Sequence, residues 1–318
     1  MIGCGAIAER YMLVLKPRMA TLSVAVDLDG DTASEFARVH GFTRWATDYQ
    51  DICDDVDAVI LCVPNYLHAP VTVAFLERGI SVLCEKPMAT SLAEARKMAD
   101  AADRSDGVLA IANVRRHYWS SQEVARILSD GSMGDWISIE AEEGSIFGWP
   151  TKSGFFFDKR SSGGGVLIDM GSHLLDLILW WTGDYPSSIS CRDDNFGGVE
   201  ADCEMEFLFP GDKRVAVKHS RLRNLDNRYD ISLDGGTITV RPYEFNSLTI
   251  TEPSGAVRVV RAPKNRSIEG YFQVMVADYL AAVTGVRPLS FSPEEILPSI
   301  RLIEECYDKA TRLGLPWL

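Results

Sequence analysis

The first third of the chain alternates short, almost continuously apolar segments with amphipathic segments of helical period. The strands are expected at residues 22–27, 57–63, 80–84 and 108–112, and the helices at 6–18, 31–40, 66–79 and 91–104. Strands that lack a polar face must be covered on both sides, as they are in parallel sheets wrapped by helices. With right-handed crossovers, this pattern predicts a doubly wound parallel sheet of the α/β class.

A small-residue turn stands at the beginning of this pattern, where Gly3, Gly5 and Ala8 form a G-x-G-x-x-A sequence. The first Gly permits a tight turn, and the second lets a pyrophosphate approach the backbone at a helix N-terminus. Asp27 ends the next strand, where a carboxylate can accept both hydroxyls of an adenosine ribose and repels a 2′-phosphate. We therefore expect a Rossmann domain that binds NAD rather than NADP through Gly3, Gly5, Ala6, Ile7, Ala8 and Asp27.

Only Met1 and Ile2 precede the turn, although a central strand of about five residues should lead into Gly3. The strand is therefore expected to be largely missing from the sequence as written. Met1 is then not the true start, upstream residues are omitted, or the strand is truncated. The first two are favoured, because losing a central parallel strand would weaken the sheet and the cofactor site together.

Polar residues also follow the second and third expected strands, at the edge where open α/β sheets place their ligands. The cofactor contacts expected there are Pro64, Asn65, His68, Glu85 and Lys86. Lys86 precedes Pro87, and an X-Pro bond permits a cis geometry that would aim the lysine inward. We expect that geometry here.

A strongly apolar helix is expected at 166–181, and its polar side chains, Asp169, Ser172, His173 and Asp176, fall on one stripe. Buried ionisable groups are costly unless they are paired or used in chemistry. Asp169 and His173 are four residues apart and can touch, so the carboxylate would orient the imidazole and raise its basicity. A purely structural Asp–His pair is the alternative. A metal site is not expected, because no second His or Cys has a suitable spacing nearby.

The alternation of apolar strands and helices ends near residues 113–118. Beyond them we expect helices at 120–130, 166–182, 267–284 and 293–312, and strands at 135–143, 186–193, 200–209, 214–222, 228–233, 236–241, 246–251 and 256–260. Turn signals separate these strands, which indicates a mainly antiparallel sheet. The chain is therefore expected to form a Rossmann domain at 1–116 and, at 117–318, an α+β domain with a mainly antiparallel sheet.

Charge and cysteine content narrow the class of protein. The formal net charge is −13, which argues against a nucleic-acid or anionic-membrane surface. The first twenty residues lack the pattern of a signal peptide, and no long apolar run indicates a membrane span. The seven cysteines form no C-x-x-C pair and several lie in apolar runs, so buried free thiols in a reducing cytoplasm are expected.

Together these motifs resemble the glucose–fructose oxidoreductase/inositol dehydrogenase/MocA family. The resemblance rests on the Gly3 turn, the Asp27 strand, Glu85-Lys86-Pro87 and the run from Gly163 to Asp176, and it covers nearly the whole chain. It implies catalysis by Lys86 with an Asp169–His173 pair. It also implies that the domain at 117–318 binds substrate and that its open sheet makes the contacts of a homodimer or homotetramer.

On this resemblance, His173 would take the proton of a substrate hydroxyl while hydride passes to the nicotinamide of NAD. Asp169 would orient His173, and Lys86 would donate a hydrogen bond to the reacting oxygen. The substrate is expected to be a sugar, a cyclitol or a nucleotide-sugar, contacted by Lys86, Arg115, Trp149, Asp169 and His173. If the segment at 113–118 is extended, Arg115 and Arg116 cannot both point inward, and one of them would face solvent or make a salt bridge.

Two other functions use the same features. An NAD-dependent glycosidase would oxidise its substrate transiently and recycle the bound cofactor. A non-catalytic dinucleotide sensor would not need Lys86 or His173, and because both residues are present that function is less favoured.

Overall fold

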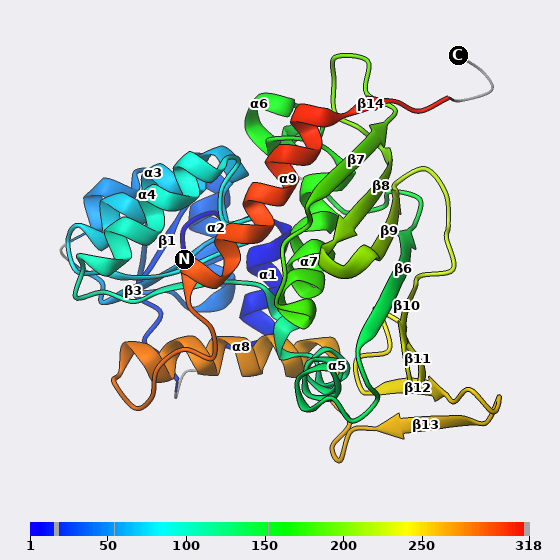
Figure 1. Ribbon diagram of the computed structural model, residues 1–318. Helices are drawn as coiled ribbons and strands as arrows, with labels where there is room; N and C mark the ends of the chain where they lie inside the picture. The colour runs from blue at the N-terminus through cyan, green and yellow to red at the C-terminus, as the bar shows by residue number, and fades with distance from the viewer. Residues whose placement is uncertain (16–18, 54, 152, 315–318) are drawn as a thin grey trace.

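The computed structural model describes residues 1–15, 19–53, 55–151 and 153–314. Figure 1 shows helices packed around a small parallel sheet at the N-terminal end and a broad twisted sheet formed by the rest of the chain. The expected fold class is confirmed by this arrangement. No helix within the described ranges is both long and apolar enough to cross a membrane.

The N-terminal domain follows the expected alternation of strand and helix. Its strands are β1 (Val24–Val26), β2 (Arg44–Ala46), β3 (Ala58–Leu61), β4 (Ser81–Cys84) and β5 (Leu109–Ile111), and its helices are α1 (Ala6–Val14), α2 (Gly30–His40), α3 (His68–Leu76) and α4 (Leu92–Asp103). Every strand pair within this domain is parallel. The short strand β2 was not predicted, because its exposed Arg-Trp start carries no apolar run. The last residues of the helix expected at 6–18 lie outside the described part of the chain.

The residues before Gly3 take the place of the central strand. Ile2 bridges Val26 of β1 and Leu61 of β3, both in parallel register. The N–H of Ile2 donates to the carbonyl of Ile60 at 2.9 Å, and its carbonyl accepts from the N–H of Cys62 at 2.7 Å. Bridges at the single residue Ile2 thus join β1 to β3, and the described residues contain no longer strand leading into Gly3, as expected from the short segment before the turn.

The second sheet has nine strands in the order β13-β12-β11-β10-β6-β9-β8-β7-β14. They are β6 (Trp136–Gly144), β7 (Ser188–Asp193), β8 (Asp202–Phe209), β9 (Lys213–Ser220), β10 (Arg228–Leu233), β11 (Gly236–Val240), β12 (Ser247–Thr251), β13 (Val257–Arg261) and β14 (Thr311–Arg312). The β6–β9 and β7–β14 pairs are parallel and the others are antiparallel, so the mainly antiparallel sheet is confirmed.

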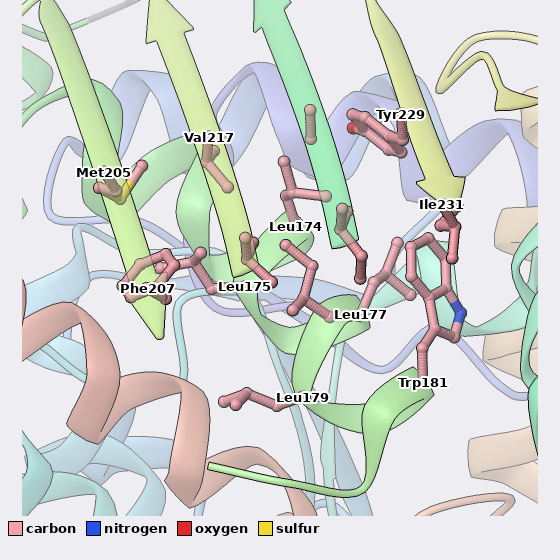
Figure 2. Close-up of a cluster of buried hydrophobic side chains, with 14 of the residues drawn as sticks. Leu174, Leu175, Leu177, Leu179, Trp181, Met205, Phe207, Val217, Tyr229 and Ile231 are labelled. Atoms are coloured by element: carbon pink, nitrogen blue, oxygen red, sulfur yellow. The ribbon is translucent and has the colours of Figure 1, made fainter. Parts of the chain in front are cut away.

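Helix α7 (Val166–Thr182) covers one face of this sheet. Figure 2 shows leucines of α7 pointing at Met205 and Phe207 of β8 and at Val217 of β9. Leu174 and Leu175 are completely buried. Burying each such side chain contributes about 1.5–3 kcal/mol, so the helix that carries Asp169 and His173 is held firmly in place.

The remaining helices are α5 (Trp119–Asp130), α6 (Lys159–Ser162), α8 (Ile268–Val283) and α9 (Leu297–Lys309). Although α8 and α9 follow the second sheet in sequence, they pack against the N-terminal domain (Figure 1). Phe272 of α8 contacts Tyr11 of α1 edge to face, and the hydroxyl of Tyr279 donates to the carbonyl of Val59 at 3.2 Å. The two domains therefore share an extensive apolar interface.

All seven cysteines are buried and none of them forms a disulfide, as the sequence predicted. Burial raises the pKa of Cys203 well above its ordinary value. Such thiols behave as small core hydrophobes rather than as nucleophiles.

Candidate functional site

The predicted phosphate turn has the geometry that a dinucleotide requires. Gly3 has φ +86°, and a Cβ there would lie 2.4 Å from the carbonyl oxygen of Cys62, so no other residue fits. Gly5 is the N-cap of α1 and offers no side-chain cap, while a Cβ at Gly5 would meet no atom within 4 Å. A helix N-terminus with open space above its first turn fits an incoming pyrophosphate.

Asp27 lies beside this turn at the end of β1. Its Oδ2 accepts from the N–H of Cys4 at 2.9 Å, and its Oδ1 accepts from the N–H of Asp29 at 3.1 Å. The Asp29 carboxylate accepts from the N–H of Thr32 at 2.7 Å and caps α2. Asp27 is thus the carboxylate that faces the turn, and it fits the ribose of a dinucleotide.

Lys86 reaches from the end of β4 to the other domain. The Lys86–Pro87 bond is cis, as expected. The Lys86 Nζ donates to the Oδ1 of Asp169 at 2.5 Å and to its backbone carbonyl at 3.0 Å. The structure therefore brings together two of the three predicted catalytic residues from opposite domains.

Asp169 also pairs with a second positively charged side chain, which was not among the predicted site residues. The Nη2 of Arg221 donates to the Asp169 Oδ2 at 2.8 Å. Burial by itself would raise the pKa of the Asp169 carboxyl, but Lys86 and Arg221 outweigh it and hold that pKa well below its usual range. Asp169 is therefore an ionised carboxylate at any physiological pH.

His173 lies one turn further along α7, and the predicted contact with Asp169 was wrong. Within the described residues both Asp169 carboxylate oxygens accept from cations, and the Nδ1 of His173 is buried without a hydrogen-bond partner. Burial lowers the pKa of His173 well below its ordinary value, and the positive charges of Arg115 and Lys86 lower it further. The imidazole is thus neutral, and Asp169 turns to the two charged groups instead.

Two of the predicted cofactor contacts serve the protein interior instead. His68 is completely buried, with its ring nitrogens 2.7 and 3.0 Å from the carbonyl oxygens of Pro87 and Val63. Glu85 accepts from the hydroxyl of Tyr11 at 2.6 Å, and its other oxygen accepts from the N–H of Lys86 at 3.1 Å. The prediction of direct cofactor contact is wrong for both, because their polar atoms are already engaged below the surface of the site.

Asn65 bridges the domains, since its side-chain amide donates to the carbonyl of Ser162 at 2.7 Å. It follows Pro64 at the carboxyl end of β3, beside the nucleotide turn. Both residues stay predicted cofactor contacts.

Arg115 is not available to bind a substrate, contrary to prediction. It donates to both carboxylate oxygens of the fully buried Glu143, at 2.6 and 2.7 Å, and to the hydroxyl of Tyr229 at 2.8 Å. Arg116 is buried as well and donates twice to Asp176, at 2.8 Å each. The segment is a 3₁₀ turn rather than extended, so both arginines turn inward to buried carboxylates and neither faces solvent.

Aromatic side chains from residues 147–157 lie beside two arginines, Arg10 and Arg221. Trp149 is half-buried and lies under the guanidinium of Arg10 on α1, 5.3 Å from its ring centroid. Phe147 packs against Phe156 and Phe157. Trp149 therefore lies beside α1, while Phe147 and Phe156 lie beside the guanidinium of Arg221.

The glycines before α7 fit around a buried carboxylate that was not predicted. A Cβ at Gly165 would lie 1.9 Å from the carbonyl oxygen of Glu200, and one at Gly164 would lie 1.9 Å from the hydroxyl of Tyr307. The Oε1 of Glu200 accepts from the N–H groups of Gly165 and Leu167, both at 2.9 Å. This contact caps the helix N-terminus and fixes the turn that presents Asp169. Three consecutive glycines were the only signal in the sequence.

Comparison with protein families matches both halves of the chain. Residues 1–113 match the model of an oxidoreductase family with an NAD-binding Rossmann fold, GFO/IDH/MocA, and residues 121–239 match the model of the GFO/IDH/MocA C-terminal domain.

Individual relatives share part of their length with this chain. It is 30% identical to a trans-1,2-dihydrobenzene-1,2-diol dehydrogenase of Danio rerio over 65% of this chain and 62% of that protein. It is 30% identical to the levoglucosan dehydrogenase of Pseudarthrobacter phenanthrenivorans over 53% of this chain and 44% of that protein. The chain thus matches about half the length of these curated relatives.

A solved structure of a levoglucosan dehydrogenase in complex with NADH and levoglucosan is also similar. It aligns with a TM-score of 0.85 and 19% identity, over 97% of this chain and 95% of that one. At that identity the similarity shows a shared fold.

Proposed function

The chain belongs to the GFO/IDH/MocA family of oxidoreductases, and we propose that it transfers a hydride between NAD and a hydroxyl-bearing or keto carbon of a sugar, a cyclitol or a nucleotide-sugar. The observation that carries this proposal is the contact between Lys86 and Asp169, with the neutral His173 one turn away. It brings a hydrogen-bond donor from the end of β4 to the helix that carries a neutral proton acceptor.

Lys86 stabilises the reacting oxygen. An ammonium group has three N–H bonds, and Asp169 accepts two of them. The third N–H donates to the oxygen of the substrate hydroxyl, and this hydrogen bond becomes stronger as the carbonyl forms. Asp169, held ionised by two cations, keeps the ammonium in place and does not itself take up a proton.

His173 accepts the hydroxyl proton in the oxidative direction. A neutral imidazole is the form required of a general base, and burial together with the nearby cations keeps it neutral. In the reductive direction the protonated ring returns that proton. NAD, when bound, supplies the hydride acceptor or donor.

The residues that would hold NAD are those of the turn and the strand ends. Gly3, Gly5, Ala6, Ile7 and Ala8 leave the helix N-terminus open to the pyrophosphate, and Asp27 binds the adenosine ribose. Pro64, Asn65 and Lys86 line the edge toward the nicotinamide. The negative charge of Asp27 favours NAD over NADP.

The aromatic side chains of residues 147–157 favour a carbohydrate. Phe147 and Phe156 flank the guanidinium that binds Asp169, and their flat apolar faces suit the C–H faces of a ring, as does that of Trp149 beside Arg10. Lys86 and Asp169 supply polar groups that suit hydroxyls. Cyclitols, free aldoses, levoglucosan and other cyclic diols share this chemistry.

A panel of these compounds tests the proposal. The purified protein is mixed with aldoses, inositols, levoglucosan, trans-1,2-dihydrobenzene-1,2-diol and nucleotide-sugars, and NADH or NADPH formation is followed by absorbance. We expect turnover with NAD for at least one sugar or cyclitol. Absence of any redox activity, with tight NAD binding retained, would refute the enzyme and favour a sensor. Glycoside cleavage without net NADH formation would favour a glycosidase.

Two variants then assign the roles. Lys86→Met and His173→Ala should each lower kcat by about 10²–10⁴-fold. Lys97→Met is the matched control, because Lys97 is exposed on α4 away from the site. Unchanged turnover in His173→Ala would exclude it as the base.

A further inference from the structure

Arg221 enters the site directly from the end of β9, and its backbone is fixed on both sides. Its N–H donates to the carbonyl of Ala201 at 2.7 Å, and its carbonyl accepts from the N–H of Phe147 at 2.8 Å. The side chain is only 8% exposed. A long cationic side chain buried to this extent has a defined position rather than a surface one.

The guanidinium of Arg221 uses its edge and its face for different partners. Its Nη2 donates to the Asp169 Oδ2 at 2.8 Å. Its Cζ lies 5.1 Å from the ring centroid of Phe147 and 5.6 Å from that of Phe156. A planar guanidinium can serve a carboxylate and aromatic rings at the same time, which a lysine ammonium cannot.

The Asp169 carboxylate has two oxygens and three polar groups near it. Lys86 takes Oδ1, so Oδ2 is left for either Arg221 or His173. Arg221 takes it, and a charge-assisted hydrogen bond is stronger than one to a neutral imidazole. The orientation of the carboxylate toward Lys86 is therefore set from the side opposite to Lys86.

We infer that Arg221 is a positioning residue, whose edge holds the Asp169 carboxylate on Lys86 and whose face holds the aromatic residues Phe147 and Phe156 against the site. Without Arg221, Lys86 would be the sole cation on Asp169 among the residues that the structure describes, and the ammonium would follow the carboxylate as it turns. The effect of Arg221 on turnover rests on the proposed function, whereas its effect on the position of Asp169 does not.

Crystal structures of variants test the positioning without any substrate. In Arg221→Met we expect the Asp169 carboxylate to rotate, with loss of at least one of the two contacts from Lys86. In Arg221→Lys, which keeps the charge but lacks the planar face, we expect Asp169 to stay in place while Phe147 and Phe156 move apart. An unchanged Asp169–Lys86 contact in Arg221→Met overturns the inference.

Arg223→Met is the matched control for these structures. Its side chain is 58% exposed and pairs only loosely with Asp202, at 3.6 Å. We expect the site to be unaltered in this variant. If Arg221→Met does not fold, the positions of Phe147 and Phe156 in Arg221→Lys test the inference. If these two rings do not move, the guanidinium face of Arg221 does not position them.

Kinetics with the best substrate of the panel supply the second measurement. A carboxylate displaced by about 1 Å can cost about 10²-fold in rate, so kcat of Arg221→Ala should fall by that order while the Kd for NADH stays unchanged. Added guanidinium should restore part of kcat in Arg221→Ala and none in Lys86→Met. Unchanged kcat, or a change confined to KM, overturns the inference. If the wild-type protein turns over nothing, the proposed function fails, and the crystal structures still decide the positioning.

Discussion

Glu143→Gln tests whether the charge of Arg115 is bound within the fold rather than offered to a substrate. Glu143 is fully buried and accepts from Arg115 twice, from the hydroxyl of Tyr243 at 2.9 Å and from that of Tyr229. Burial alone would raise the pKa of the Glu143 carboxyl, but the Arg115 guanidinium outweighs it and holds that pKa at about 2. The ordinary value is 4.5.

A carboxyl whose pKa is lower in the folded than in the unfolded protein stabilises the fold at pH values above its unfolded-state pKa. That stabilisation is complete above pH 4.5 and is lost as the pH falls toward the folded pKa of about 2. Linkage with these two pKa values gives a loss of about 2 kcal/mol in the free energy of unfolding between pH 6 and pH 3. Gln cannot titrate, so this share of the acid dependence should disappear in Glu143→Gln.

The variant should also be less stable at neutral pH, because Arg115 keeps its charge in a buried position without a counterion. Removing one partner of a buried pair costs about 3–5 kcal/mol. Urea unfolding followed by circular dichroism, for both proteins at pH 6 and pH 3, measures both effects. If the two proteins lose the same free energy between these pH values, the assigned pairing of Arg115 is wrong.

Three further substitutions test the buried pair next to the site, the support of α7 and the choice of cofactor. Arg116→Met leaves Asp176 buried without its cation, so the free energy of unfolding in urea should fall by about 3–5 kcal/mol. Gly165→Ala would bring a Cβ to 1.9 Å from the Glu200 carbonyl oxygen, so the melting temperature and the turnover should fall together. Asp27→Asn keeps an acceptor oxygen but removes the negative charge, so the NADP/NAD ratio of kcat/KM should rise on the order of tenfold.

Matched variants control these measurements. Gly198→Ala adds a Cβ with no atom within 4 Å and should melt like the wild-type protein. The double variant Arg116→Met/Asp176→Leu removes both charges and should recover part of the lost stability. An Asp27→Asn protein with an unchanged cofactor ratio would exclude Asp27 as the discriminating group.

The sequence predicted well those residues whose positions follow from local pattern and sheet topology. Gly3, Asp27 and Lys86 stand at the ends of apolar strands, and parallel strands bring such ends to one edge. Asp169 and His173 stand on one stripe of an unusually apolar helix. The positions of these residues do not depend on tertiary contacts with distant segments of the chain.

Arg221 and Glu200 could not be placed in the same way. Each lies at the end of a strand or in a loop of the second sheet, and each meets α7 only through the tertiary packing of that sheet. An arginine after a strand looks like any surface arginine in the sequence. The partners of Arg115 and Arg116 were hidden for the same reason, since Glu143 is supplied by β6 and Asp176 by α7.

The spacing of Asp169 and His173 shows where a local rule fails. Four residues on a helix permit contact, but they do not decide between competing partners. Burial keeps the imidazole neutral, while Lys86 and Arg221 bring two full charges to the same carboxylate. The partners of the Asp169 carboxylate are therefore set by charged side chains from other elements, which the spacing along the helix cannot predict.

The contact between Lys86 and Asp169 joins the two domains, so its geometry depends on what holds them together. Helix α9 does this directly, because Ile300 packs into the core of the N-terminal domain while Tyr307 reaches the first turn of α7. The Tyr307 hydroxyl accepts from the N–H of Ile168 at 3.2 Å and donates to the Glu200 Oε1 at 2.8 Å. One rigid helix thus fixes the Rossmann core and the turn that presents Asp169 relative to each other. Close-packed interiors resist sliding, so the distance from Lys86 to Asp169 is set before any substrate arrives, which is the preorganisation that electrostatic stabilisation of a reacting oxygen requires.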